Sequence, residues 1–184
     1  MPTDLRPAIP LDSVDVRGPR FAAWLTSTVL VLVLVLAAAA PAAAAPAAAA
    51  PAAAAVLLGA QAIVFALGAL QGPRRSPYGR IYAALIAPRV GPVTETEPAA
   101  PLRFAQLLGL VFSAVGLLGF LAGSTVVGGL FVGFALFAAF LNAAFGICLG
   151  CQIYPLVTRL RRITGLTHPG GSATDHPRVT PAPN

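Results

Sequence analysis

Four long apolar runs constrain this chain more than any other feature of its sequence. They cover about residues 21–40, 52–71, 104–122 and 125–149, and none of them contains Asp, Glu, Lys, Arg or His. An α-helix rises about 1.5 Å per residue, so about 20 apolar residues cross a hydrocarbon layer of ~30 Å. Only 10% of the residues are charged, against about 25% in ordinary soluble domains. The sequence therefore predicts an all-α, polytopic membrane protein whose four transmembrane helices form two helical hairpins in the lipid bilayer.

The placement of the arginines predicts the orientation of these spans. All twelve basic residues are arginines, and they lie before the first run, in the loop 72–103 and after the fourth run. With four spans, these three segments share one side of the membrane, and the two opposite connections carry no charge. By the positive-inside rule we expect both termini and the loop 72–103 in the cytoplasm, with the protein in the inner cell membrane. The arginines flank apolar runs instead of forming a stripe, which argues against nucleic-acid binding.

The chain divides into three parts on this interpretation. Residues 1–19 are expected to be a flexible cytoplasmic tail, residues 20–155 the transmembrane domain, and residues 156–184 a basic and then disordered cytoplasmic tail. The repeat of Pro and Ala over residues 41–55 predicts a broken connection at the far membrane face, since proline interrupts helices. The first run also resembles a secretory signal peptide, because Arg17 and Arg20 precede it and Ala-x-Ala triplets follow. Cleavage there would leave the remaining orientation unchanged.

The polar loop 72–103 contains one helical signal. Its apolar residues recur at the spacing of a single helix face: Tyr78, Ile81, Tyr82, Leu85 and Ile86. This spacing predicts a short amphipathic helix on the cytoplasmic side. Such a helix either lies on the membrane surface or caps the bundle.

Small and polar residues within the spans predict how the helices pack. Pairs of glycines four residues apart, such as Gly119 with Gly123 and Gly129 with Gly133, allow the close approach that membrane helices use. Gln61 and Asn142 are the polar side chains deepest in the second and fourth runs. We expect both to face inward and to hydrogen-bond between helices, as packing contacts more often than as a transport site.

The two cysteines of the chain, Cys148 and Cys151, form a C-x-x-C motif at the end of the fourth run. In one continuous helix, they would lie on the face opposite Asn142, Gly146 and Gly150. Their Cα atoms would be about 5 Å apart, within the range of a disulfide. The negative end of the helix dipole would disfavour a thiolate there.

Pro155 is expected to kink or end that helix just beyond the pair. Cys151 would be nearer the water and would act as the attacking thiol, with Cys148 as the resolving thiol. Packing is an equally good interpretation, because cysteine is a good small hydrophobe. Metal binding is a weaker alternative, since only His168 and His176 in the C-terminal tail could complete a set of four ligands. We predict no metal and no cofactor.

Five stretches of the chain resemble the bacterial integral-membrane family known as domain of unknown function 4395. They are VDVRGPRFAAWL (Val14–Leu25), SPYGRIY (Ser76–Tyr82), APRVGP (Ala87–Pro92), PLRFAQLLG (Pro101–Gly109) and NAAFGICLGCQIY (Asn142–Tyr154). The resemblance implies a small polytopic membrane protein, and genes of the family are often found near thioredoxin-like proteins and thiosulfate sulfurtransferases. The family also carries a Glu-Asp pair before the second Arg-Phe-Ala, whereas here Glu97 is followed by Pro98.

The resemblance, added to the residues, favours a membrane-embedded dithiol. It would exchange disulfides or a sulfane sulfur with a cytoplasmic thioredoxin-like or thiosulfate sulfurtransferase partner. Two alternatives remain: a component for transport of a small sulfur anion, and a structural scaffold with purely packing cysteines. The sequence does not decide whether the protein is an enzyme. Residues expected to support the cysteines by position or charge are Asn142, Gly146, Gly150, Tyr154, Arg159, Arg161 and Arg162.

Overall fold

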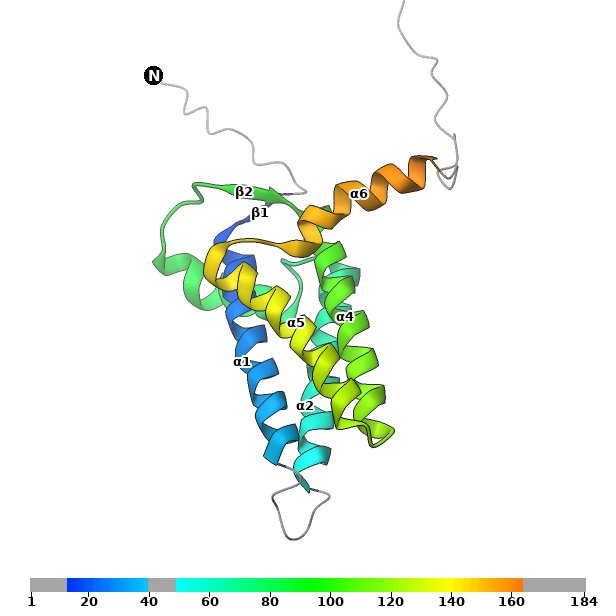
Figure 1. Cartoon of the computed structure of the whole chain (residues 1–184). Coiled ribbons are helices and arrows are strands. Elements are labelled where there is room, and N and C mark those ends of the chain that lie inside the picture. The colour runs from blue at the N-terminus through cyan, green and yellow to red at the C-terminus, as the bar shows by residue number, and fades with distance from the viewer. Residues whose placement is uncertain (1–12, 40–48, 164–184) are drawn as a thin grey trace, which may run out of the picture.

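The structure of the protein is a computed structural model that describes residues 13–39 and 49–163. Within these residues, four helices are long and apolar enough to cross a membrane. They are α1 (Arg17–Ala39), α2 (Ala49–Gln71), α4 (Ala99–Leu121) and α5 (Thr125–Phe145) (Figure 1). The predicted helical, four-span architecture is confirmed, with one short pair of strands added to it, and the protein is a multi-pass membrane protein.

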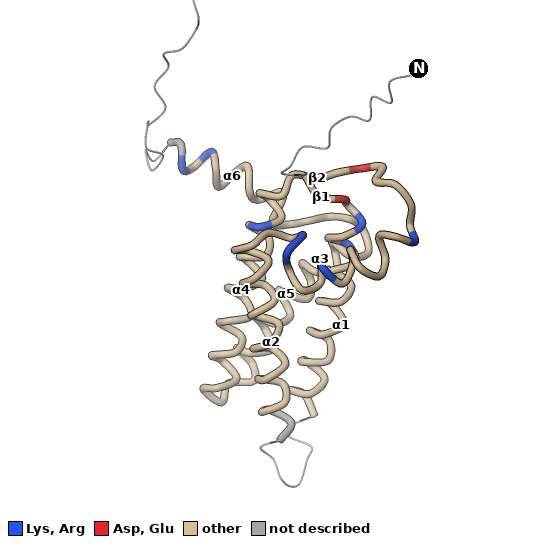
Figure 2. Tube along the Cα trace, turned by 180° about the vertical axis from the view of Figure 1, so that it is seen from behind, with Lys and Arg blue, Asp and Glu red and all other residues tan. Residues whose placement is uncertain are grey.

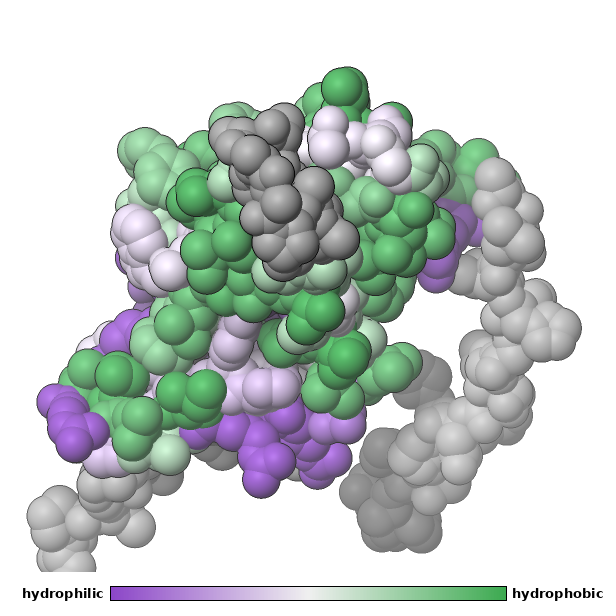
Figure 3. Space-filling view, turned by 90° about the horizontal axis from the view of Figure 1, so that it is seen from below, coloured by the Kyte–Doolittle hydropathy of each residue, from purple (hydrophilic) through white to green (hydrophobic). Residues whose placement is uncertain are grey.

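The four long helices form a closed bundle. α2 packs against α1 and α4, and α5 packs against the same two helices. The two predicted hairpins, α1 with α2 and α4 with α5, are therefore both present. The buried core lies in the half of the bundle away from the arginines, where Leu30, Leu58 and Val132 have no exposed surface. The outer surface of the bundle is mainly apolar where the view from below shows it (Figure 3). Such a surface suits contact with lipid.

The closest helix contacts involve single glycines, not the predicted pairs. A Cβ atom on Gly119 would lie 2.7 Å from the backbone nitrogen of Gly128, so α4 and α5 approach to backbone contact there. Gly123, in contrast, is in the turn after α4 with φ +77°, and Gly129 and Gly133 face open space. The prediction of G-x-x-x-G packing therefore holds for Gly119 but was wrong for Gly123, Gly129 and Gly133.

A polar cap covers the arginine-rich end of the bundle (Figure 2). Strand β1 (Ser13–Asp15) pairs antiparallel with β2 (Thr96–Pro98), with Val14 opposite Glu97. Residues 13–19, which we expected to be flexible, therefore form this strand and the start of α1. The short length of the two strands and their wide separation in sequence left no periodic signal to predict them.

The predicted amphipathic segment is helical and belongs to the same cap. It consists of α3 (Pro77–Ile81), the π-helical turn η2 (Tyr82–Ile86) and the 3₁₀ turn η3 (Ala87–Arg89). Tyr82 is buried against Gly18 and the ring of Phe21. Not all apolar residues of the segment turn inward, since Leu85 is 53% exposed. Tyr82 thus anchors the segment as a cap on α1.

The fourth span ends earlier than the sequence predicted. α5 stops at Phe145, because Gly146 adopts a left-handed conformation (φ 70°) and its N–H bonds to the carbonyl of Asn142. A second helix, α6 (Leu149–Ile163), then leaves the bundle and passes through Pro155 without ending. A left-handed glycine is a common helix terminator, and here it replaces the break that we assigned to Pro155. Residues 156–163 therefore belong to α6, while the predicted disorder of the remaining tail and most of the Pro-Ala connection lie outside the described residues.

Candidate functional site

The cysteine pair lies at the beginning of a helix, not at the end of one. Cys148 is in the break between α5 and α6, and Cys151 is in the first turn of α6. A disulfide joins them, with their Cα atoms 5.2 Å apart. The backbone N–H of Cys151 also donates a hydrogen bond to Sγ of Cys148 at 3.3 Å. A helix N-terminus stabilises negative charge, so the expectation that the helix dipole disfavours a thiolate here was wrong.

Gly150 lets the start of α6 lie directly on α4. A Cβ atom at this position would be 2.6 Å from the Cα of Ala105, so only glycine fits without movement of the helices. One turn later, the rings of Tyr154 and Phe104 are in contact, with their centroids 5.9 Å apart. These two contacts fix the direction in which α6 leaves the bundle and hold the disulfide at its edge.

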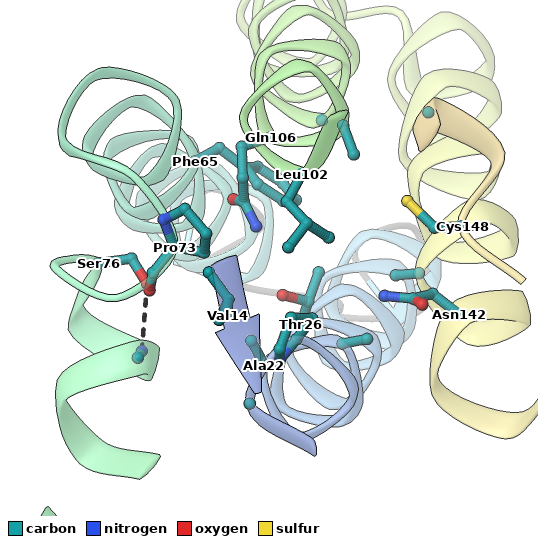
Figure 4. A pocket seen from close by; sticks show the side chains of 18 of the residues that line it. Val14, Ala22, Thr26, Phe65, Pro73, Ser76, Leu102, Gln106, Asn142 and Cys148 are labelled. Carbon is teal, nitrogen blue, oxygen red and sulfur yellow. Dashed lines mark hydrogen bonds between the residues drawn. The ribbon is translucent and has the colours of Figure 1, made fainter. Parts of the chain in front are cut away.

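A cavity of about 330 Å³ lies below the cap, between the upper halves of α1, α2, α4 and α5. Most of its wall is apolar, and small residues on α5 (Ala135, Ala138 and Ala139) leave the space open. Its polar side chains within the spans and at their end are Thr26, Gln106, Asn142 and Cys148. In the close view, the sulfur of Cys148 and the amides of Gln106 and Asn142 point into this space (Figure 4).

This cavity corrects the helical-face prediction. We expected the cysteines to lie opposite Asn142 and Gly150, but Cys148 lines the same cavity as both of them. The reason is the break at Gly146, which ends the regular 100° step between residues of one helix. Asn142 does face inward as predicted, although its side chain makes no hydrogen bond within the described part of the chain.

A second, more open groove lies on the other side of the disulfide. It has a volume of about 280 Å³ and is lined by Glu97, Pro98, Pro101, Gly146, Cys148, Cys151 and Gln152. Cys148 borders both the cavity and the groove, whereas Cys151 borders only the groove. The disulfide therefore separates a space among the transmembrane helices from a space at the polar end of the molecule.

Two charged residues near the groove were not identified as site residues from the sequence. Burial raises the pKa of the Glu97 carboxyl above its ordinary value of 4.5, the nearby Glu95 raises it further, and Arg20 opposes both effects. The Arg20 guanidinium also lies against Gly146, since a Cβ atom there would be 3.7 Å from its Cζ. The family's acidic pair was the one sequence signal for Glu97, and Arg20 had none beyond its place at the start of the first span.

The remaining predicted site residues lie farther from the pair. Arg159 and Arg161 are exposed along α6, and the side chain of Arg162 is outside the described residues, as are His168 and His176. Among the described residues, no group of three or more His, Cys, Asp or Glu side chains is placed to hold a metal ion.

Gln61 forms a polar link across the bundle, as the sequence predicted. It is 1% exposed, and its Nε2 donates to Thr26 Oγ1 at 3.4 Å. The hydroxyl of Tyr78 donates to Gln61 Oε1 at 2.7 Å. The link joins α2 to α1 and to the cap, beside the cavity that Thr26 also lines.

The fold and the site define a class: a multi-pass membrane protein with a C-x-x-C pair near its C-terminal helix, between an internal cavity and a polar groove. The family model for DUF4395, described as a domain of unknown function, matches residues 14–159, and the chain belongs to this family. The resemblance drawn from the five sequence stretches is thereby confirmed. Comparison with curated proteins and with solved structures gives no match.

Proposed function

We propose that the protein exchanges disulfides with a cytoplasmic thioredoxin-like partner through Cys148 and Cys151. The observation that carries the proposal is the position of the disulfide at the N-terminus of α6, bordering a groove at the polar end of the molecule. Thioredoxin-type motifs use the same end of a helix, where the dipole stabilises the thiolate that leaves or attacks. Cys151 lines this groove, so a partner residue that enters the groove can reach its sulfur.

The exchange proceeds through one mixed disulfide. A partner thiolate attacks Sγ of Cys151, the bond between the two cysteines breaks, and Cys148 leaves as a thiolate at the start of α6. The second partner thiol then attacks the mixed disulfide and releases Cys151. The partner loses two electrons and becomes a disulfide, while the membrane pair becomes a dithiol. In the reverse direction Cys151 is the attacking thiol and Cys148 the resolving thiol, so Cys151 carries the mixed disulfide either way.

Glu97 supplies proton exchange in the same groove. Because its pKa is raised, the Glu97 carboxyl keeps its proton to a higher pH than an ordinary glutamate does. Such a carboxyl can give a proton to a leaving thiolate or take one from an attacking thiol.

A second candidate is transfer of a sulfane sulfur from a thiosulfate sulfurtransferase partner or from thiosulfate itself. The Arg20 guanidinium beside Gly146 favours it, since a positive charge there attracts an anionic donor. In this reaction a Cys151 thiolate takes the outer sulfur of thiosulfate, forming a persulfide and releasing sulfite.

A sulfur-anion transporter is less well supported, because the packed core around Leu30, Leu58 and Val132 closes the far half of the bundle.

The same proposal places the arginine-rich end in the cytoplasm. Every arginine whose position is described lies at the end that carries the cap and α6 (Figure 2), which fits the positive-inside rule. A fluorescent protein fused to the C-terminus should fluoresce, and alkaline phosphatase fused there should be inactive. An active phosphatase would reverse the orientation and place the partner outside the cytoplasm.

The deciding experiment traps the partner. The Cys148→Ser variant, expressed in cells, should form a mixed disulfide through Cys151 that reductant releases and mass spectrometry identifies. Cys151→Ser is the matched control and should trap much less, because Cys148 is turned partly toward the cavity. If neither variant traps a thiol protein, and a double Cys→Ala variant behaves as wild type, the cysteines serve packing and the proposal fails.

A further inference from the structure

We propose that the cavity beneath the cap binds the ring of a membrane quinone, which reoxidises the Cys148–Cys151 dithiol. The inference rests on the proposed disulfide exchange and adds the electron acceptor that it requires. It applies to either orientation of the protein, because a quinone dissolves in the bilayer and reaches the bundle from the lipid.

Residues 13–39 and 49–163 show no second redox group that could take the electrons from the pair. Each round of partner oxidation leaves two electrons on the pair, and the sequence contains only these two cysteines. Within the described residues no cluster of side chains could hold a redox metal. An acceptor from outside must therefore take two electrons and two protons, and the cavity that Cys148 lines is a space in which a lipid-soluble acceptor can meet the pair.

The walls of the cavity suit a quinone ring. Phe65 and Phe112 contribute aromatic surface, and the alanines of α1 and α5 leave room for a flat ring between them. The amides of Gln106 and Asn142 point into the space (Figure 4). Neither amide forms a hydrogen bond within the described part of the chain, so both are free to donate to the carbonyl oxygens of a quinone. An apolar pocket with a few convergent donors is the usual form of such sites.

The size of the cavity fits the ring and excludes the tail. Its volume of about 330 Å³ lies at the lower end of the range for small-molecule pockets, roughly 300–1,000 Å³. A substituted benzoquinone or naphthoquinone ring fits in this volume, but its isoprenoid tail does not. Because the cavity is partly open, the proposal requires the tail to leave it toward the bilayer.

The oxidation step balances without a further reactant. The sulfur of Cys148 points into the cavity, and it donates electrons to the ring as Sγ of Cys151 closes on it to form the disulfide. The quinone takes the two electrons and the two protons of the thiols and leaves as the hydroquinone. The N–H groups of Gln106 and Asn142 stabilise the negative charge that develops on the carbonyl oxygens.

The division of the site keeps the two half-reactions apart. The partner reaches Cys151 from the groove, whereas the quinone meets Cys148 from the cavity. Neither reactant blocks the other, and the partner's own thiols do not contact the quinone.

The test uses the full-length protein in lipid nanodiscs, reduced and then freed of reductant without oxygen. Addition of a short-chain ubiquinone analogue should give one hydroquinone for each protein, together with loss of both thiols. Ala139→Phe fills the cavity and should slow this reaction roughly tenfold or more, because a small misplacement of reactants costs that much. Ala60→Phe, at an exposed position of α2, is the matched control and should react like wild type.

A second measurement covers the case in which Ala139→Phe does not fold. A photoreactive azidoquinone should label wild-type protein on the cavity-facing residues of α1 and α5, and excess ubiquinone analogue should prevent this. Label confined to lipid-facing positions, no hydroquinone from the reduced wild type, or equal rates for the two Phe variants would each overturn the inference. A protein that traps a partner through Cys151 yet reduces no quinone retains the proposed function and loses only this acceptor.

Discussion

Gly150 and Ala105 are in backbone contact, and this contact sets the position of the disulfide. A Cβ atom on Gly150 would be 2.6 Å from both the Cα and the Cβ of Ala105. Because backbone cannot move aside as a flexible side chain does, a larger residue at 150 has to push α6 away from α4. The cysteines on either side of Gly150 would move with it.

Gly150→Val should therefore destabilise the protein and open the site. Overpacking of this kind costs about 1–3 kcal/mol, which a thermal unfolding assay in detergent can measure. After reduction, both cysteines of the variant should react faster with a water-soluble maleimide than those of wild type. Gly133→Val is the control, because Gly133 lies in α5 with open space around it, and it should leave both measurements unchanged. Equal effects of the two substitutions would mean that the contact with Ala105 does not hold α6 in place.

Glu97→Gln should change how stability depends on pH. The folded protein holds the proton of Glu97 more tightly than the unfolded chain, since burial raises the pKa of this carboxyl. Between the ordinary value of 4.5 and the raised value, the folded state binds more protons, so stability falls as the pH rises. The variant carries no such group and should show a weaker decline in melting temperature from pH 4.5 upward.

Glu95→Gln provides the comparison for that experiment. Removing the neighbouring charge lowers the pKa of Glu97 in part, so the decline should still begin near pH 4.5 but end at a lower pH and be smaller than in wild type. If Glu97→Gln follows the wild-type curve, the raised pKa of Glu97 is wrong.

Gln61→Leu should weaken the bundle at the level of the cavity. The substitution removes the bonds to Thr26 and to the Tyr78 hydroxyl. Hydrogen bonds between membrane helices contribute about 0.6 kcal/mol each, so a loss of roughly 1 kcal/mol is expected in a thermal unfolding assay. Gln106→Leu is the matched change at a glutamine without a hydrogen bond among the described residues, and it should cost less. A larger loss of stability for Gln106→Leu would mean that Gln106, and not Gln61, forms the stabilising polar contact.

The sequence predicted the spans well because length and polarity decide them. Each run is long enough to cross the bilayer and carries no charge, and no alternative satisfies its backbone in lipid. The inward position of Gln61 followed from the same reasoning. The cap was only partly predicted: the helical spacing around Tyr82 is visible in sequence, but the pairing of Val14 with Glu97 is a contact between distant three-residue strands without a local signal.

The sequence identified the two cysteines of the site, but it did not predict how they are placed relative to the helices. A glycine in an apolar run can stay helical, as Gly133 does, or end the helix, as Gly146 does with φ 70°. Only the surrounding packing decides between these, here the contact of Gly150 with α4. Because α5 ends at Gly146, Cys148 lies at the positive N-terminal end of α6 instead of the negative C-terminal end of a longer α5. The same break turns the Cys148 sulfur toward the cavity. The cavity itself depends on which faces of four helices meet, which one sequence does not specify.

Tyr82→Phe should loosen the cap from α1. The Tyr82 hydroxyl donates to Oδ2 of Asp15 at 3.0 Å, and a hydrogen bond to a carboxylate contributes about 1.5–3 kcal/mol. Burial and this bond both raise the pKa of Tyr82 above 10.0. Above pH 10 the unfolded tyrosine loses its proton before the folded one, so the wild-type protein loses stability there and the difference from the variant narrows. Tyr154→Phe, which keeps the ring contact with Phe104, should leave the melting temperature near the wild-type value at neutral pH. A Tyr82→Phe melting temperature equal to wild type at pH 7 would show that the bond to Asp15 does not hold the cap.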